Sequence, residues 1–439
     1  MLGVFRVSRR VVRATGGVAA SLFGDSMLYA VLPAQMPAFG VSPAVVGLVL
    51  SVNRFVRLWS NGLAARVYLR FGLQVPFAMA IAVGALTTLL YGVIAGASAF
   101  LALRALWGVC YSFLRLGGYL VVLEESTPRN RGQVMGFFNG GQRAGSIVGA
   151  LLGGILFDLL ARERSFLVMG VLTALGLLLV GGLKKPSLPL GDDPLPSPSK
   201  PVPVRPISLR GIGGWFTGML ALDLRARSRD THRRWLTLCI ALFCLTFTMQ
   251  GLLTATLGYY LRQRLGANFT VPVLGVGIAS VSAGFLAVRW VVDLLGPGLG
   301  ALADRWGRRR TITVCLPLLA AGMLALAWVH PVGVALAFLP LVFLTATACQ
   351  VCLDALAGNF APRDLRPMLL GRYTTWADLG AAAGPLLGYL GLVRASLPLL
   401  YSAAAVLLLV GVGLFASSAF RPEPAAVVRQ PRSPAAPSP

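Results

Sequence analysis

Long apolar segments constrain this chain more than any other feature of its sequence. Apolar runs of about twenty or more residues alternate with short loops along the 439 residues, and only 12% of the residues are charged. As a helix, a run of that length crosses the roughly 30 Å of hydrocarbon in a bilayer. Since lipid offers no hydrogen-bond partners to the backbone, such segments must be helical. We therefore expect an integral membrane protein.

The apolar segments predict twelve transmembrane helices in two groups of six. The first group forms an N-terminal six-helix bundle within residues 1–183, and the second forms a C-terminal bundle within 236–420. We place the helices at 16–38, 44–63, 74–96, 98–121, 134–158, 164–183, 236–261, 272–296, 311–329, 332–357, 368–394 and 396–418. The expected fold class is an all-α membrane protein.

Residues 184–235 and 421–439 differ in composition from the apolar segments. The first stretch begins proline-rich and then mixes aromatic residues with arginines, so we expect a basic cytoplasmic linker. Its second part fits two structures, a short helix on the membrane face or an unstructured stretch. The tail is rich in Pro, Ala and Ser and is expected to be disordered.

Basic residues set the expected orientation. Most of the 39 lysines and arginines lie in the N-terminal arm, in alternate loops, in the central linker and in the tail. The positive-inside rule then places both termini in the cytoplasm, and we expect a bacterial inner membrane. The net charge of +24 also favours contact with anionic lipids. Nucleic-acid binding is not expected, because the basic residues are dispersed at helix ends.

The six cysteines lie scattered inside apolar segments, and the chain has two histidines. We interpret the cysteines as small core residues and expect no metal site and no disulfide framework. Cys349 and Cys352 form a C-x-x-C, which leaves a redox or metal site as a minor alternative.

Glycines recur at every fourth position in the segment 134–158. Gly145, Gly149 and Gly153 fall on one face of the expected helix, which lets another backbone approach closely. The same spacing returns 235 residues later at Gly380, Gly384 and Gly388, with Pro385 after the middle one. We expect both ladder helices to make the close contacts between the two halves.

The offset of 235 residues also relates charged positions. It maps Arg54 onto Arg289 and Arg143 onto Asp378. A constant offset across several helices predicts two pseudo-symmetric halves of one design. Arg143 and Asp378 are then expected at similar depth with opposite charge. Because Arg143 points away from the glycine stripe, we expect it to face a cavity or lipid-side neighbours.

The loop between the predicted eighth and ninth helices reads GALADRWGRRR over residues 300–310. It resembles a motif of the major facilitator superfamily of secondary transporters, in which glycine permits close helix contact and Asp and Arg lock the cytoplasmic helix ends. The resemblance assigns these roles to Gly300, Asp304, Arg305, Gly307 and Arg308. The first-half copy, ARVYLRFG at 65–72, lacks the first glycine and the aspartate, so the charged lock is expected to be weak in that half.

Two further stretches resemble the same superfamily. Arg104 to Gly108, RALWG, is similar to its arginine motif, with Trp107 where a glutamine is usual. The first glycine ladder resembles the motif of its drug:proton antiporters, with Ala150 in place of the expected proline. The resemblance implies the major facilitator fold, transport by alternating access and a monomer that needs no cofactor.

Polar and arginine side chains share faces on the second and fourth predicted helices. Arg54, Arg57 and Asn61 form one face, and Arg104, Tyr111 and Arg115 form the other. Such residues at bilayer depth predict a water-filled, positively charged cavity. Guanidinium groups there can recognise a carboxylate or phosphate, or they can snorkel and tie helices together.

The intramembrane aspartates are expected to play different roles. Asp25 and Asp378 lie near mid-membrane and are candidates for proton coupling, with Asp378 pairing with an arginine in one state. Asp293 follows Arg289 by four residues, so we expect the two to neutralise one another. Asp354 is expected to be solvated or to cap its helix. Gln250 is a further candidate for hydrogen bonding to substrate.

These features favour a secondary active transporter that exports a small organic molecule in exchange for protons. An importer or exchanger of organic anions that uses the arginine-lined cavity is the first alternative. A scaffold or sensor that has the transporter fold without flux is the second. An enzyme is not expected, since no nucleophile, base and metal-ligand set shares a face.

Overall fold

The computed structural model describes residues 7–127, 130–181, 183, 229–272, 274–360 and 366–419. Most of these residues are helical. The first half comprises α1 (Arg9–Ala34), η1 (Met36–Phe39), α2 (Pro43–Phe71), α3 (Gln74–Val93), α4 (Ala97–Glu124), α5 (Arg131–Leu159) and α6 (Arg162–Val180). The second comprises α8 (Arg229–Thr246), η2 (Phe247–Leu253), α9 (Thr254–Leu265), α10 (Ile278–Leu294), α11 (Gly296–Trp306), α12 (Arg308–Trp328), α13 (Val332–Ala337), α14 (Leu339–Phe360), α15 (Arg366–Leu392) and α16 (Leu397–Ala419).

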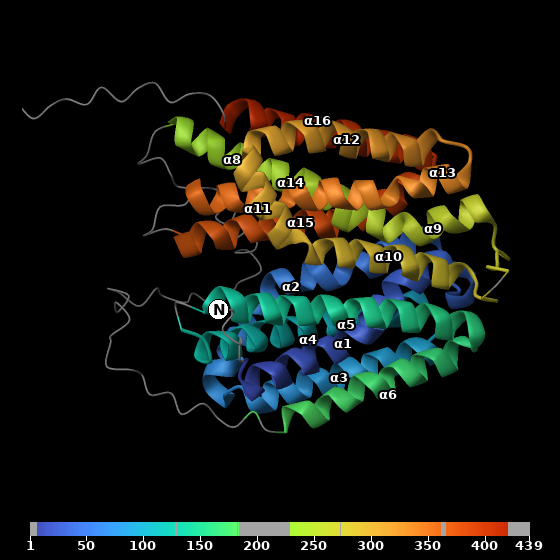
Figure 1. Cartoon of the computed structure of the whole chain (residues 1–439). Helices are drawn as coiled ribbons and strands as arrows, with labels where there is room; N and C mark the ends of the chain where they lie inside the picture. Colours follow the sequence, from blue (N-terminus) through green and yellow to red (C-terminus); the bar gives the residue numbers. More distant parts are fainter. Residues whose placement is uncertain are drawn as a thin grey trace, which may run out of the picture.

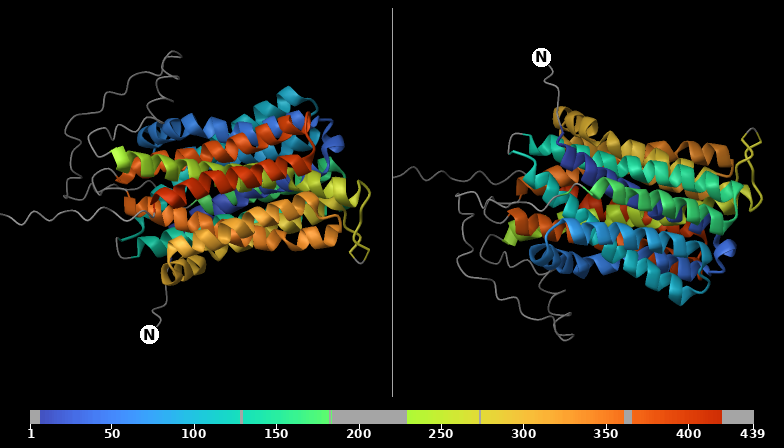
Figure 2. Two further views of the ribbon diagram at one scale, coloured as in Figure 1. Left: turned by 90° about the horizontal axis from the view of Figure 1, so that it is seen from above. Right: turned by 90° about the horizontal axis from the view of Figure 1, so that it is seen from below.

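The helices form two bundles that lie side by side, α1–α6 in one and α8–α16 in the other (Figure 1). All long helices run nearly along one direction, and Figure 2 shows the same arrangement from two further sides. We call the end at which α1 and α8 begin and α16 ends the terminal end. The other end carries η1 and the connection between α9 and α10, and we call it the distal end.

The number of spans agrees with the sequence prediction. Among the described residues, eight helical segments are long and apolar enough to cross a membrane, and the bent pair α10 and α11 adds a ninth. The helices α2, α5 and α15 have 29, 29 and 27 residues and carry more charged and polar side chains. Together they supply the twelve predicted spans, so the all-helical membrane fold is confirmed.

Two spans depart from regular α-helix. The seventh span contains the π-helical segment η2 between α8 and α9, a local widening that is common at functional sites. The eighth span bends by 51° between α10 and α11, where Gly296 and Pro297 begin the new helix. Proline lacks an N–H group and its ring obstructs the preceding turn, which explains the bend.

The ladder glycines pack within each half, although they were expected to make the close contacts between the two halves. A Cβ built on Gly145 would lie 2.5 Å from the Ala19 carbonyl oxygen, and one on Gly149 would lie 2.5 Å from the Cα of Phe23, both on α1. Gly153 continues the contact against Met27. In the second half, Gly380 and Gly384 pack against α8 and η2 in the same way.

The same two helices do contact the other half, but through different residues. Beside the ladder, Gly154 of α5 lies against Ala279 and Ser280 of α10. On the other side of the molecule, a Cβ on Gly47 of α2 would lie 2.8 Å from the carbonyl oxygen of Pro385 on α15. Small residues thus bring the backbones together both within and between the halves.

The seventh span begins at Arg229, earlier than the predicted residue 236, so the last part of the expected linker is helical. The rest of that linker, with its candidate membrane-surface helix, and the tail 421–439 lie outside the described residues.

The terminal ends of both halves are tied by charged side chains. Asp304 at the end of α11 accepts hydrogen bonds from Arg308 at the start of α12 (2.9 and 3.0 Å). Gly307 between them has a φ of +92°, which a residue with a side chain rarely adopts. Gly300 packs against Val351, and Arg305 lies exposed in the last turn of α11.

The first half has a charged lock of its own, contrary to the expected weakness. Arg10 near the start of α1 pairs with Glu125 (2.7 Å) and Glu124 (3.1 Å) at the end of α4. Residues outside the degraded motif therefore make the tie in this half.

Candidate functional site

A cavity of about 650 Å³ lies between the two bundles. Its wall comes from α1, α2, α4 and α5 on one side and from η2, α9, α10, α11, α14 and α15 on the other. Pockets for small ligands fall in the range of about 300–1,000 Å³, so this one suits a small organic molecule. Its polar lining includes charged side chains from both halves.

Five arginines and three aspartates line the cavity among the described residues. The arginines are Arg54, Arg57, Arg115, Arg143 and Arg289, and the aspartates are Asp25, Asp293 and Asp378. Tyr111 and Gln250, which the sequence also put forward, are part of the same wall. The structure therefore brings most of the predicted residues together.

Asn61 is an exception. It shares the helical face of Arg54, but seven residues place it about 10 Å further along α2 toward the terminal end. There its side chain is exposed and does not line the cavity. The helical periodicity was right, and the assumption that the cavity extends that far along this face was wrong.

Close packing of α2 against α4 positions the first-half arginines. A Cβ on Gly108 would lie 2.5 Å from the Asn53 carbonyl oxygen, so only glycine allows this approach. One turn along α4, the Ser112 hydroxyl hydrogen-bonds with that of Ser60 on α2 (2.6 Å). The two helices thus meet along faces that adjoin their arginines, which places Arg54, Arg57 and Arg115 at the cavity wall.

Arg104 lies behind this wall and is completely buried. One of its terminal nitrogens donates to the Asp25 carboxylate in an ion pair, and its guanidinium stands 5.1 Å from the centre of the Tyr29 ring. Its Nε and other terminal nitrogen have no hydrogen-bond partner among the described residues. A buried charge needs a paired counter-charge, so Asp25 is committed to Arg104.

Asp378 reaches across from α15 toward two arginines of the first half. Its carboxylate oxygens lie 3.7 Å from Nη2 of Arg57 and 3.9 Å from Nη1 of Arg115. Arg57 stands over the Tyr111 ring at 5.1 Å, and Arg115 stands over the Tyr119 ring at 5.7 Å. These rings hold the two guanidinium groups at the cavity surface.

Asp293 pairs with Arg143. The sequence spacing had suggested Arg289 as its partner, and that prediction was wrong. The Arg143 guanidinium lies 3.4 Å from the Asp293 carboxylate, which also accepts a hydrogen bond from Thr347 (3.2 Å). Arg289 instead donates to the Met249 carbonyl (3.3 Å) and to the Thr254 hydroxyl. That carbonyl lies in the π-helical segment η2, and it also accepts a hydrogen bond from the Thr254 hydroxyl (2.7 Å).

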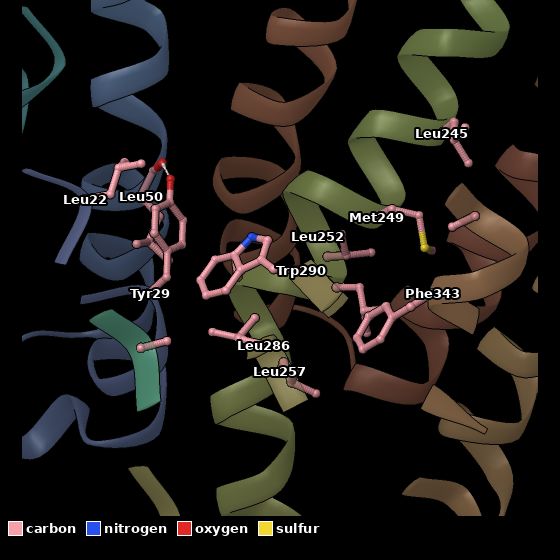
Figure 3. Packing of buried hydrophobic residues seen from close by; sticks show 14 of the residues in the cluster. Leu22, Tyr29, Leu50, Leu245, Met249, Leu252, Leu257, Leu286, Trp290 and Phe343 are labelled. Atoms are coloured by element: carbon pink, nitrogen blue, oxygen red, sulfur yellow. Dashed lines mark hydrogen bonds between the residues drawn. The ribbon is translucent and has the colours of Figure 1, made fainter. Parts of the chain in front are cut away.

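Aromatic and apolar side chains complete the cavity. Tyr29 accepts a hydrogen bond from Arg54 Nε (3.4 Å) and donates to the Leu50 carbonyl (3.5 Å). Figure 3 shows the bond from Tyr29 to the Leu50 carbonyl, with Leu22 beside it. It also shows Trp290 of α10 among the buried residues of the core. Trp107 and Trp290 also line the cavity, so the charged groups stand among flat apolar surfaces.

Contacts between the halves close the distal end. Asp158 at the end of α5 accepts from the backbone N–H (2.8 Å) and hydroxyl (2.6 Å) of Ser280 in the first turn of α10. Arg262 of α9 donates to the Ala34 carbonyl (3.0 Å) at the end of α1. Each half thus supplies a charge that caps a helix end of the other and suits the dipole there.

The cavity extends from this closed end toward the terminal end, where Tyr119, Gly136 and Pro297 belong to its wall. Asp354 lies toward the terminal end of α14. It was expected to be solvated or to cap its helix, and its side chain is exposed. It accepts hydrogen bonds from Tyr373 (2.7 Å) and Gln350 (2.9 Å).

A model of the Major Facilitator Superfamily matches residues 14–299 and 294–439. This chain belongs to the Major Facilitator Superfamily. It is therefore a secondary transporter, and the predicted superfamily and fold are confirmed. The match supports no particular subfamily, such as the drug:proton antiporters. No curated protein matches the chain.

Solved structures share the fold over nearly the whole chain. The nucleoside transporter NupG matches with a TM-score of 0.68 at 13% identity over 95% of this chain and 100% of its own. The human organic anion transporter MFSD10 (TETRAN) matches with 0.62 at 19% identity, over 93% and 99%. The peptide transporter POT, in complex with sulfate, matches with 0.68 at 16% identity, over 95% and 96%.

Sequence reasoning missed several residues of this transporter's cavity. Arg289 could have been found, because it is the mate of the candidate Arg54 at the constant offset. Asn139, Gln142 and Thr347 gave no signal, since single polar residues in a helix are common and usually bond locally. Thr246 shows that usual behaviour and donates to the Leu242 carbonyl (2.9 Å).

Proposed function

We propose that this transporter carries a small organic anion by alternating access. The observation that carries the proposal is the wall of five arginines around the cavity. Asp25 is matched by the buried Arg104, so within the described ranges only Asp293 and Asp378 remain as acidic partners for those five arginines. The substrate site thus carries an excess of positive charge at bilayer depth.

An excess of charge in this setting favours a counter-ion. Ionised groups inside a membrane are costly unless they are paired or reach water, and an anionic substrate supplies the missing partner. Guanidinium groups also match carboxylates geometrically, since they donate two parallel hydrogen bonds. The same fold carries organic anions in human MFSD10 and is seen with sulfate in POT, which fits this chemistry.

The structure corresponds to one of the two states that alternating access requires. The distal end is held closed by capping contacts between the halves, and the cavity extends the other way. With the terminal end in the cytoplasm, as the positive-inside rule suggests, this is an inward-facing state. An outward-facing state then requires the Asp158 and Arg262 contacts to break.

Proton coupling is the second part of the proposal, and we assign it to Asp378. Its distances of 3.7 and 3.9 Å from two arginines leave room for a proton or a substrate group to replace either partner.

The direction of transport rests on the glycine ladder alone. Since that ladder packs against α1, helix contact accounts for its spacing in an importer as well as in an exporter.

Uptake by purified protein in proteoliposomes tests the function. We expect flux of at least one labelled carboxylate, benzoate or succinate, and no flux of the hydrophobic cation tetraphenylphosphonium. Arg57→Gln and Arg115→Gln should each lower uptake at least about tenfold, since a charged hydrogen bond contributes about 1.5–3 kcal/mol. Arg66→Gln, at an exposed position of α2, is the matched control and should transport normally.

Other outcomes point to other functions. Transport of the cation in place of the carboxylates would support drug export and contradict the anion proposal. Absence of flux for a wider panel of charged and neutral solutes would support a scaffold or sensor. Carboxylate uptake that is unchanged in both arginine variants would move the substrate site away from this wall.

A further inference from the structure

Two ionic links connect the halves across the cavity, one at Asp378 and one at Asp293, and both have the same polarity. Arg57 and Arg115 of the first half face Asp378 of the second, and Arg143 of the first half faces Asp293 of the second. Each pair joins two of the spans that meet between the halves. The first-half wall is therefore basic at both places and the second-half wall is acidic.

The internal repeat relates these two ionic links. The offset of 235 residues maps Arg143 onto Asp378, and it maps Leu58, the neighbour of Arg57, onto Asp293. The pairs thus occupy nearly equivalent places around the pseudo-two-fold axis, with the charges exchanged. Such an arrangement gives the cavity two acid–base links between halves that must move relative to each other.

The link to Asp378 is loose. Charge-assisted hydrogen bonds have lengths of about 2.7–2.9 Å, whereas the two distances here are 3.7 and 3.9 Å. The Nε of Arg57 is buried and has no hydrogen-bond partner in the part of the chain that the structure describes. The two guanidinium groups therefore hold a carboxylate between them without using their full hydrogen-bonding capacity.

We propose that Asp378 is a built-in competitor for the substrate: its carboxylate occupies the anion site between Arg57 and Arg115 until the carboxylate of the substrate displaces it. This inference rests on the proposed anion transport and names the substrate group as a carboxylate. The free anion can approach both arginines more closely than Asp378, whose reach is limited by the position of α15.

Displacement has a consequence for the transport cycle. When the substrate carboxylate binds both arginines, the links from α2 and α4 to α15 are broken, and the carboxylate is held between two helices of the first half. Asp378, whose side chain is 23% exposed to the cavity, is then free to bind water or a proton. The competitor thus offsets part of the positive charge of the empty site, and substrate binding changes the contacts between the halves.

Arginine labelling tests the inference without knowledge of the natural substrate. Phenylglyoxal reacts with accessible guanidinium groups, and peptide mass spectrometry measures its rate at each arginine. Asp378→Asn should raise the labelling rates of Arg57 and Arg115 at least about threefold, because the competing carboxylate is gone. Asp293→Asn is the matched control, which should raise labelling of Arg143 and leave the other two unchanged.

Acetate, which is the side chain of aspartate in free form, provides the second readout. In Asp378→Ala, acetate should protect Arg57 and Arg115 from phenylglyoxal at a concentration at least about fivefold lower than in the unmodified protein. Unchanged labelling in Asp378→Asn, or equal acetate protection in both proteins, would overturn the inference. Protection by inorganic phosphate but not by acetate would overturn the assignment of a carboxylate.

The result separates this inference from the proposed function. If carboxylate uptake depends on Arg57 and Arg115 but their labelling rates are unchanged in Asp378→Asn, the transporter carries anions without an internal competitor. If Asp378→Asn raises the benzoate concentration needed to protect Arg57 and Arg115 from phenylglyoxal, where we expect that concentration to fall, the aspartate contacts the substrate directly, as it would for a zwitterion. Either result would leave anion transport standing and reject the competitor.

Discussion

The buried ion pair between Arg104 and Asp25 gives the sharpest prediction about stability. Arg104 is 0% exposed, and two of its three nitrogens have no hydrogen-bond partner in the described part of the chain, whereas Asp25 is 15% exposed and lines the cavity. Asp25→Asn therefore leaves a charge without a counter-charge and without water, which costs about 3–5 kcal/mol. Arg104→Gln leaves a carboxylate that the cavity can hydrate, so we expect a smaller cost of about 1–3 kcal/mol.

The double variant distinguishes pairing from other effects. With both charges removed, the destabilisation should fall short of the sum of the single variants by about 2 kcal/mol, because neither side chain is left unpaired. A thiol-reactive dye can follow thermal unfolding in lipid nanodiscs, since five of the six free cysteines are buried. The reasoning is refuted if Asp25→Asn unfolds at a higher temperature than Arg104→Gln, or if the two effects simply add.

Two further predictions concern helix contacts. Gly149→Leu should destabilise the packing of α5 on α1 by about 1–3 kcal/mol, whereas Gly140→Leu, where nothing lies within 4 Å of an added Cβ, should unfold at the normal temperature. Asp158→Asn should weaken the distal closure by about 1 kcal/mol. A cysteine placed at the buried Ser282 should then react about fivefold faster with an impermeant maleimide. The control Glu163→Gln, at an exposed position, should leave that rate unchanged. Equal unfolding temperatures for the glycine variants, or equal maleimide rates for the acidic ones, would contradict these assignments.

The positions of the helices were predictable from the sequence because bilayer thickness fixes their length. Most predicted spans agree with the structure to within a few residues, and the repeat correctly anticipated two similar bundles. The arginines of the cavity were also predictable, since Arg54 and Arg57 lie on one helix face and are costly anywhere except toward a cavity or a partner.

The ionic partners were less predictable than the residues themselves. Asp293 and Arg289 have the spacing of a local pair, but Arg143, which is distant in sequence, lies at the same level on α5 and takes the aspartate. Arg289 instead donates to the Met249 carbonyl within the π-helical turn. Neither the packing of α5 on α10 nor that turn can be read from periodicity, because both depend on tertiary contacts.

The glycine ladder shows a similar limit. Its spacing specifies that some helix approaches closely, but the pattern does not identify the partner. Gly145 and Gly149 pack on α1 within their own half, and Gly154 on the adjacent face makes the contact with α10. A stripe of small residues thus predicts a close contact and leaves its position in the fold open.

A density map of the transporter in nanodiscs with a transported carboxylate bound would show directly whether the substrate displaces Asp378. We predict density for the carboxylate within hydrogen-bonding distance of both Arg57 and Arg115, with the Asp378 carboxylate displaced beyond 4 Å from either guanidinium. Density elsewhere in the cavity, with Asp378 still between the two arginines, would contradict it.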